Sequence, residues 1–269
     1  MDPIARKNLR TYFILAYVIF WLLLVFTGLS IVLKVPPVVQ TAMETVCAWA
    51  PTFALLIMYK RVFPGVPLLT WLKKQFPRVC ALDFVVPAVL QVLAVACAVG
   101  AYLVINGKSL GSLQFVSAID VLPLLVVKLT SGPMGEELGW RAYALNERQK
   151  TFSPLVSSLF IGVIWGFWHL PLWLLSGYSG GTLALYVASF LVAIISTSVL
   201  ITFFYNRSGN ILVAVWVHFL FNFLLSAVKI DTVPLLAYTS ITYLVAALLV
   251  VAFGRRTMMR TPTLSADPF

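Results

Sequence analysis

The chain has 269 residues, of which 61% are apolar and only 10% are charged, and its mean hydropathy is +0.98. A soluble domain contains roughly 45 to 50% apolar and about 25% charged residues, so this composition excludes an ordinary soluble protein. A membrane-spanning helix needs about 20 apolar residues, and most of the sequence consists of such runs. We therefore predict an all-α, polytopic membrane protein.

Eight apolar segments predict transmembrane helices. In chain order they cover residues 11–33, 38–59, 82–105, 121–145, 155–175, 182–204, 211–229 and 233–253. The expected organisation is a short N-terminus at 1–10, a single transmembrane domain at 11–253 and a polar, disordered tail at 254–269. Eight crossings place both termini on the same side of the membrane.

The basic residues predict which side this is. Of the 19 lysine and arginine residues, 15 fall in the terminal segments and in the loops on their side, whereas three fall in the opposite loops. By the positive-inside rule, both termini are expected in the cytoplasm, which implies an integral, multi-pass protein. The same asymmetry explains the net charge of +10. Anionic membrane lipids are therefore the expected partners, and nucleic acid is not.

Glu44 and Lys128 are expected at similar depth near the outer ends of the second and fourth helices. We predict that they form a buried ion pair. A lysine that extends to the outer surface is the alternative.

Ionisable residues also gather in the second half of the chain. Each costs at least about 2.5 kcal/mol at the centre of a spanning helix, so several at matched depth indicate a functional site. The two histidines, His169 and His218, both lie in apolar segments. A third segment contains Glu136, Glu137 and Arg141.

The two adjacent glutamates are expected to have different partners. Glu137 and Arg141 are four residues apart, which predicts an ion pair on one helix face. Glu136 points about 100° away and is left free for chemistry. The alternative is that the whole cluster lies at the water interface and ends a helix.

Whether these polar residues can meet depends on how deep each lies along its helix. If the fourth and fifth helices turn near Thr151, Glu136 lies 15 residues before the turn and His169 lies 18 after it. At 1.5 Å per residue, both are roughly 22 to 27 Å from the turn. His218 lies about two turns into its own helix, and Asn222 follows on the same face. We therefore expect these four residues to meet.

Three ordered motifs carry a resemblance to a known family. They read Glu136-Glu137-x-x-x-Arg141, Trp165-x-x-x-His169 and His218-x-x-x-Asn222. In this order they resemble the motifs of the CPBP superfamily, also called the CAAX protease and bacteriocin-processing or Abi family, whose best-known members are Rce1-type prenyl-protein endopeptidases. The second motif begins with tryptophan, whereas phenylalanine is common in the family.

The resemblance implies an intramembrane endopeptidase that acts on a membrane-bound or lipidated, for instance prenylated, protein or peptide. Glu136 and His169 would activate a water, and His218 with Asn222 would stabilise the oxyanion. A glutamate in apolar surroundings suits a general base, and a nearby histidine can orient the water. Asparagine is an effective oxyanion donor. Supporting roles are expected for Glu137, Arg141 and Trp165.

The same residues permit a metal site. Glu136, His169 and His218 would form a His₂Glu zinc set with an open fourth position. The His-Glu-x-x-His helix of a typical zinc protease is absent from the sequence. We therefore favour a mechanism without a cofactor, with zinc as the alternative.

Two other classes of function stay open. A catalytically silent membrane protein with the same fold would act as an immunity factor, a scaffold or a maturation partner. A small-solute transporter is disfavoured because no repeats are visible in the sequence.

Overall fold

Helices make up the regular secondary structure of residues 1–260, the part of the chain that the computed structural model describes. In chain order they are α1 (Pro3–Val32), α2 (Pro37–Ala48), α3 (Ala50–Val62), α4 (Leu68–Lys74), α5 (Leu82–Ile105), η1 (Leu110–Ser112), α6 (Ala118–Thr130), α7 (Pro133–Glu137), the π-helical η2 (Leu138–Leu145), α8 (Asn146–Gln149), α9 (Pro154–Trp168), α10 (Leu170–Leu174), α11 (Gly180–Ser208), α12 (Ile211–Ala227), α13 (Thr232–Phe253) and α14 (Arg255–Met258). No β-sheet forms in this part of the chain, where Phe115 and Val228 make an isolated bridge.

The predicted all-α membrane fold is confirmed. Five stretches of the described chain are long and apolar enough to cross a membrane: α1, α5, the run from α6 to α8, α11 and α13. The bent pair of α2 and α3 makes a sixth, whereas α9 and α12 are shorter apolar helices. The count of eight crossings stays a prediction.

Prolines coincide with the breaks in three of the predicted helices. The segment expected at 38–59 bends by 46° between α2 and α3, and Pro51 lies in the first turn of α3. The fourth predicted helix restarts as α7 at Pro133, and the fifth restarts as α10 with Pro171 in its first turn. Proline suits a first turn because that turn has no partner for its N–H.

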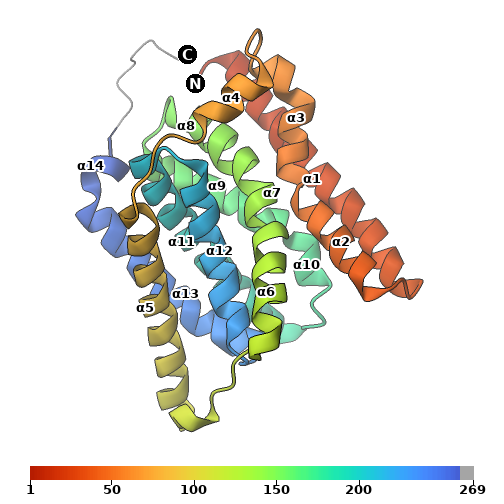
Figure 1. Cartoon of the computed structure of the whole chain (residues 1–269), viewed down its shortest axis with the longest axis vertical. Helices are drawn as coiled ribbons and strands as arrows, with labels where there is room; N and C mark the ends of the chain where they lie inside the picture. The colour runs from red at the N-terminus through yellow and green to blue at the C-terminus, as the bar shows by residue number, and fades with distance from the viewer. Residues whose placement is uncertain (261–269) are drawn as a thin grey trace.

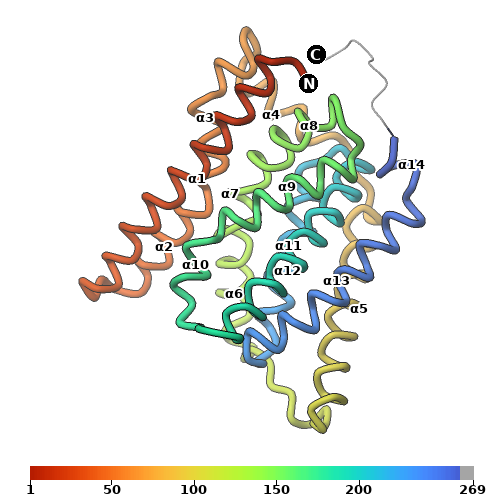
Figure 2. Tube along the Cα trace, turned by 180° about the vertical axis from the view of Figure 1, so that it is seen from behind, coloured from red at the N-terminus to blue at the C-terminus, as the bar shows by residue number. Residues whose placement is uncertain are grey.

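The helices form two groups with α7 between them (Figures 1 and 2). On one side α1 packs against α2 and α3, and on the other α11 packs against α9, α12 and α13. Helix α7 contacts α2 and α3 of the first group and α12 of the second. The two glutamates at its end are therefore in the middle of the bundle.

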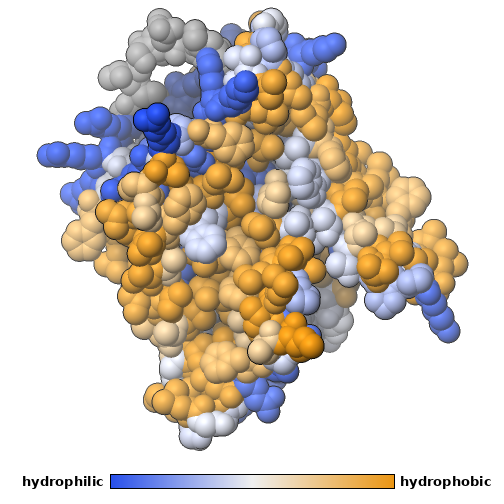
Figure 3. Space-filling view, in the orientation of Figure 1, coloured by the Kyte–Doolittle hydropathy of each residue, from blue (hydrophilic) through white to orange (hydrophobic). Residues whose placement is uncertain are grey.

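The outer surface fits a bilayer. Large apolar side chains point outward along most helices, for example Val104 (80% exposed) and Ile119 (84% exposed). Figure 3 shows these apolar residues as a broad band, with many of the hydrophilic side chains gathered at the end where α1 begins. Helix α14 lies at that same end (Figure 1). Apolar surface of this extent is typical of a lipid-facing protein.

One expectation about charged residues is wrong. Glu44 is exposed, and among the described residues it forms no ion pair with Lys128. Arg141 is fully buried in η2. Its carboxylate partner, one helical turn away, allows this burial.

The C-terminal tail is ordered farther than expected. Residues 255–258 form α14, and Met258 is buried. The predicted disorder is therefore wrong for these residues, while residues 261–269 lie outside the described part of the chain. The boundaries of a single domain at 11–253 stay a prediction.

Close helix packing depends on glycines. A Cβ on Gly139 would lie 2.6 Å from the carbonyl oxygen of Pro51 and 2.3 Å from Oη of Tyr12. Neither distance is compatible with van der Waals contact, so the α1–α3 group approaches η2 only because residue 139 has no side chain. Gly100 on α5, in contrast, faces open space.

We predict that Gly139→Ala destabilises the protein by about 1 to 3 kcal/mol, since an added methyl group forces a tightly packed backbone apart. Thermal unfolding in detergent measures the effect. Gly100→Ala is the matched control and is expected to stabilise the protein by about 0.5 to 1 kcal/mol, because alanine favours a helix interior. Equal unfolding temperatures for the two variants would contradict the packing argument.

Candidate active site

The site begins at the break between α6 and α7. Gly132 has a φ of 152°, a backbone conformation that disfavours any residue with a side chain. Its carbonyl accepts hydrogen bonds from the N–H groups of Gly135 and Glu136, which start α7. The helix is therefore interrupted here without leaving these two backbone donors unpaired.

Three polar side chains converge on Gly132. A Cβ built on this glycine would lie 3.2 Å from Nδ2 of Asn222, 3.5 Å from Oε1 of Glu136 and 3.8 Å from Nε2 of His218. The predicted meeting of Glu136, His218 and Asn222 is thus present in the structure. Because Gly132 has no side chain, a small space stays open among these three polar groups, and we call it the polar space.

Glu136 is held by tryptophans. Its carboxylate is 4% exposed, and its Oε2 accepts hydrogen bonds from Nε1 of Trp165 at 2.5 Å and from Nε1 of Trp140 at 3.3 Å. Both donors are neutral. Because Oε2 is anchored, Oε1 is the oxygen that faces Gly132.

Glu137 has charged and ionisable partners instead. Its Oε1 accepts from Nη1 of Arg141 at 3.0 Å, which confirms the predicted ion pair, and from Nδ1 of His218 at 2.7 Å. Glu137 and Arg141 are both 0% exposed. Since a carboxylate paired with arginine accepts the proton of Nδ1, the imidazole is oriented with Nε2 toward Gly132.

His169 lies at the junction between α9 and α10. Its Nδ1 is 2.8 Å from the carbonyl oxygen of Trp165, so Nδ1 is the donor and Nε2 is left free. Its ring packs against Trp168 and Phe190. No hydrogen bond joins His169 to Glu136 among the described residues; Trp165 connects them, because its indole binds Glu136 and its carbonyl binds His169.

The residues expected for zinc do not form a ligand set. Within residues 1–260, no group of three or more histidine, cysteine, aspartate or glutamate side chains is placed to hold a metal ion. Glu136 and His218 approach the same point, but His169 does not complete the set. The zinc alternative stays a prediction that metal analysis must test.

Sequence reasoning missed two residues of the site. Trp140 lies four residues after Glu136, so helical spacing alone could have identified it as a partner. The second is Gly132, on which the three polar side chains converge. Its role depends on a backbone angle and on residues 86 and 90 positions away, His218 and Asn222, which no local pattern reveals.

Comparisons with known proteins agree with the resemblance carried by the three motifs. A family model described as type II CAAX prenyl endopeptidase Rce1-like matches residues 118–224. The CAAX prenyl protease 2 of Methanococcus maripaludis is 28% identical over 153 residues. The resemblance predicted from the three motifs is confirmed. That alignment covers 54% of this chain and 56% of the relative, so the chain spans little more than half of the relative's length.

The family match covers the whole predicted site. It starts at α6 and ends within α12, and it includes every residue from Gly132 to Asn222. The first three helices and α13 lie outside it. The shared region is therefore the part of the bundle that brings the polar residues together.

The two glutamates are predicted to respond differently to neutralisation. Glu137→Gln leaves a buried arginine without its counter-ion and is expected to cost about 3 to 5 kcal/mol of stability. Glu136→Gln alters hydrogen bonds to neutral donors and is expected to cost about 1 kcal/mol. Thermal unfolding in detergent measures both values.

A double variant controls for general damage. Adding Arg141→Met to Glu137→Gln removes the unpaired charge, so it is expected to recover a large part of the lost stability. Equal losses for Glu136→Gln and Glu137→Gln, or no recovery in the double variant, would show that the ion pair does not support the site.

Proposed function

We propose that the protein is an intramembrane endopeptidase of the CAAX type that cleaves membrane-associated, prenylated proteins. The observation that carries the proposal is the convergence of Glu136, His218 and Asn222 at Gly132 inside an apolar bundle. The match of residues 118–224 to prenyl endopeptidases supports the substrate class.

Glu136 is the proposed general base. Its Oε1 takes a proton from a water, and the water oxygen bonds to the carbonyl carbon of the scissile peptide. When the tetrahedral intermediate collapses, the C–N bond breaks and the proton on Glu136 passes to the leaving amine. Trp140 and Trp165 hold the other oxygen, so the base is oriented before the substrate binds.

Asn222 and His218 are the proposed oxyanion donors. The amide of Asn222 presents Nδ2 to the polar space, and His218 presents Nε2. Nε2 can donate only when the imidazole carries both protons. The carboxylate of Glu137 accepts the Nδ1 proton and holds the ring with Nε2 toward the polar space, so Glu137 would support the oxyanion through His218.

His169 is proposed to orient the attacking water through its free Nε2. The support is that Trp165 anchors both His169 and Glu136, so a substrate or water between them would complete the contact.

We also propose that the termini face the cytoplasm, which places cleavage near the cytoplasmic leaflet. Basic residues at the end of α3, in α4 and in α14 support this orientation, and the exposed arginines and lysine before residue 11 add to it. They share the end of the molecule where α1 begins (Figure 1).

Substitution of the proposed base is predicted to slow cleavage strongly while the protein stays folded. Glu136→Gln is expected to reduce kcat on a prenylated CAAX peptide by roughly 10² to 10⁴-fold, the usual contribution of a general base. Asn222→Ala is expected to reduce it by roughly 10² to 10³-fold. His169→Ala is expected to lower kcat as well. Purified protein in detergent, assayed by mass spectrometry of the products, gives these values.

Glu44→Gln is the matched control, because Glu44 is an exposed glutamate on α2. It should cleave like wild type. Equal cleavage by wild type and Glu136→Gln would overturn the proposal, and no cleavage by any of them would favour a catalytically silent protein. A chelator arm tests zinc: activity lost with the chelator and restored by zinc would replace the metal-free mechanism.

Cysteine labelling in intact cells tests the orientation. With Cys47 and Cys97 replaced by serine, exposed Cys80 is expected to resist a membrane-impermeant maleimide until the cells are permeabilised. Ser109→Cys, placed in the opposite loop of a chain that also lacks Cys80, is expected to react at once. The reverse pattern would invert the proposed topology.

A further inference from the structure

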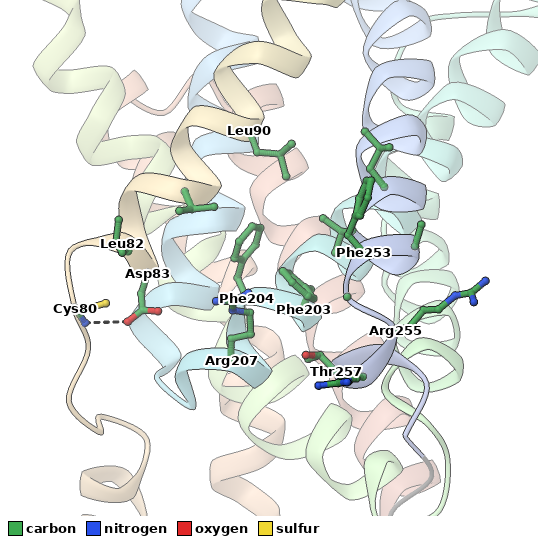
Figure 4. Close-up of a pocket in the computed structure, with 16 residues that line it drawn as sticks. Cys80, Leu82, Asp83, Leu90, Phe203, Phe204, Arg207, Phe253, Arg255 and Thr257 are labelled. Carbon is green, nitrogen blue, oxygen red and sulfur yellow. Dashed lines mark hydrogen bonds between the residues drawn. The ribbon is translucent and has the colours of Figure 1, made fainter.

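A groove of about 980 Å³ lies away from the proposed active site, between α5, α11, α13 and α14 (Figure 4). Its volume is at the upper end of the range for small-molecule sites, about 300 to 1,000 Å³. None of its lining residues belongs to α7, to α12 or to the junction between α9 and α10, where the proposed catalytic residues lie. The groove is therefore a separate feature of the bundle.

Most of the groove is apolar and faces outward. Its walls include Leu90, Phe203, Phe204 and Leu249. Phe253, at its edge, is 89% exposed. Because these residues belong to membrane-spanning helices, lipid chains are the molecules that surround the opening. An apolar groove there favours an acyl chain and not a polar ligand.

The end of the groove near α14 is basic. Arg207, Arg255 and Arg256 line it, and all three are exposed. None of them forms an ion pair with a carboxylate among residues 1–260. In Figure 4, Arg207 lies at the same end as Thr257 and beside the phenylalanines, whereas Arg255 points outward from the helix. The three positive charges are thus available to an anion.

The single acidic residue of the lining does not cancel this charge. The carboxylate of Asp83 accepts a hydrogen bond from the backbone N–H of Cys80 at 2.9 Å, shown dashed in Figure 4. Its one negative charge is outnumbered by those of the three arginines. The groove therefore combines a long apolar wall with a net positive rim at its end near α14.

We propose that this groove binds an anionic phospholipid of the surrounding leaflet, with an acyl chain along α5 and α13 and the phosphate at Arg207 and Arg256. The charge complementarity selects an anionic headgroup, and the position at the bilayer surface sets its depth. The bound lipid would join α14 to α5, two elements that are far apart in the sequence.

Native mass spectrometry of the full chain in detergent, titrated with phosphatidylglycerol, tests the proposal. Wild type is expected to bind one phosphatidylglycerol at least tenfold more tightly than phosphatidylcholine. The triple variant Arg207→Gln, Arg255→Gln, Arg256→Gln is expected to lose that preference. Ala252→Trp, which adds bulk to the groove lining, is expected to weaken phosphatidylglycerol binding to a similar extent.

Two matched controls make the result decisive. The first control also removes three exposed positive charges at the α14 end of the molecule, but outside the groove, in the triple variant Arg6→Gln, Lys7→Gln, Arg10→Gln. Ala96→Trp adds the same bulk to an exposed position of α5 outside the groove. Both should bind phosphatidylglycerol like wild type.

Three outcomes would overturn the proposal. Equal losses in the two charge variants would indicate general attraction to the protein surface. Unchanged binding by Ala252→Trp would show that the groove is not occupied. Stoichiometric displacement of phosphatidylglycerol by a farnesylated peptide would assign the groove to the substrate's prenyl chain instead.

Discussion

The buried carboxylate of Glu137 connects the two halves of the site. One oxygen receives both the guanidinium of Arg141, from the same helical run, and the imidazole of His218, from α12. The guanidinium also lies 4.5 Å from the centre of the Trp165 ring, whose N–H holds Glu136. In an apolar interior the carboxylate of Glu137 and the guanidinium of Arg141 would each be costly alone, so they are stable only as a pair. The orientation of Glu136 and of His218 thus depends on a residue that is not itself proposed to react.

Breaks in the helices bring this set together. The helix from residue 118 to 149 is interrupted at Gly132 and restarts at Pro133. This break lies where Glu136, His218 and Asn222 converge. Irregular backbone at membrane depth is tolerated where protein covers it and internal hydrogen bonds satisfy it. Here α2, α3 and α12 cover α7, and the carbonyl of Gly132 binds the first N–H groups of the new helix.

The sequence predicted what depends on local spacing. A separation of four residues predicted the ion pair of Glu137 with Arg141, and the spacing of two apolar runs predicted the turn near Thr151. The structure contains both. The approach of His218 and Asn222 to Glu136 was predicted from depth and was reinforced by the family motifs. In contrast, the bond between Glu137 and His218 spans 81 residues, and no spacing rule reaches that far. Hydropathy likewise predicted the second and fifth helices as continuous segments, because an apolar run looks the same whether or not a proline divides it.

The difference between the neighbouring glutamates gives each a distinct chemical role. Glu137 contacts a cation, so adding a proton to it would leave Arg141 buried and unpaired. Glu136 contacts two neutral indole N–H groups, and its other oxygen faces the polar space at Gly132. It can gain and lose a proton without breaking an ion pair, which is what a general base requires in each catalytic cycle. A helix separates the two carboxylates by about 100° of rotation, and this is sufficient to give one a structural environment and the other a reactive one.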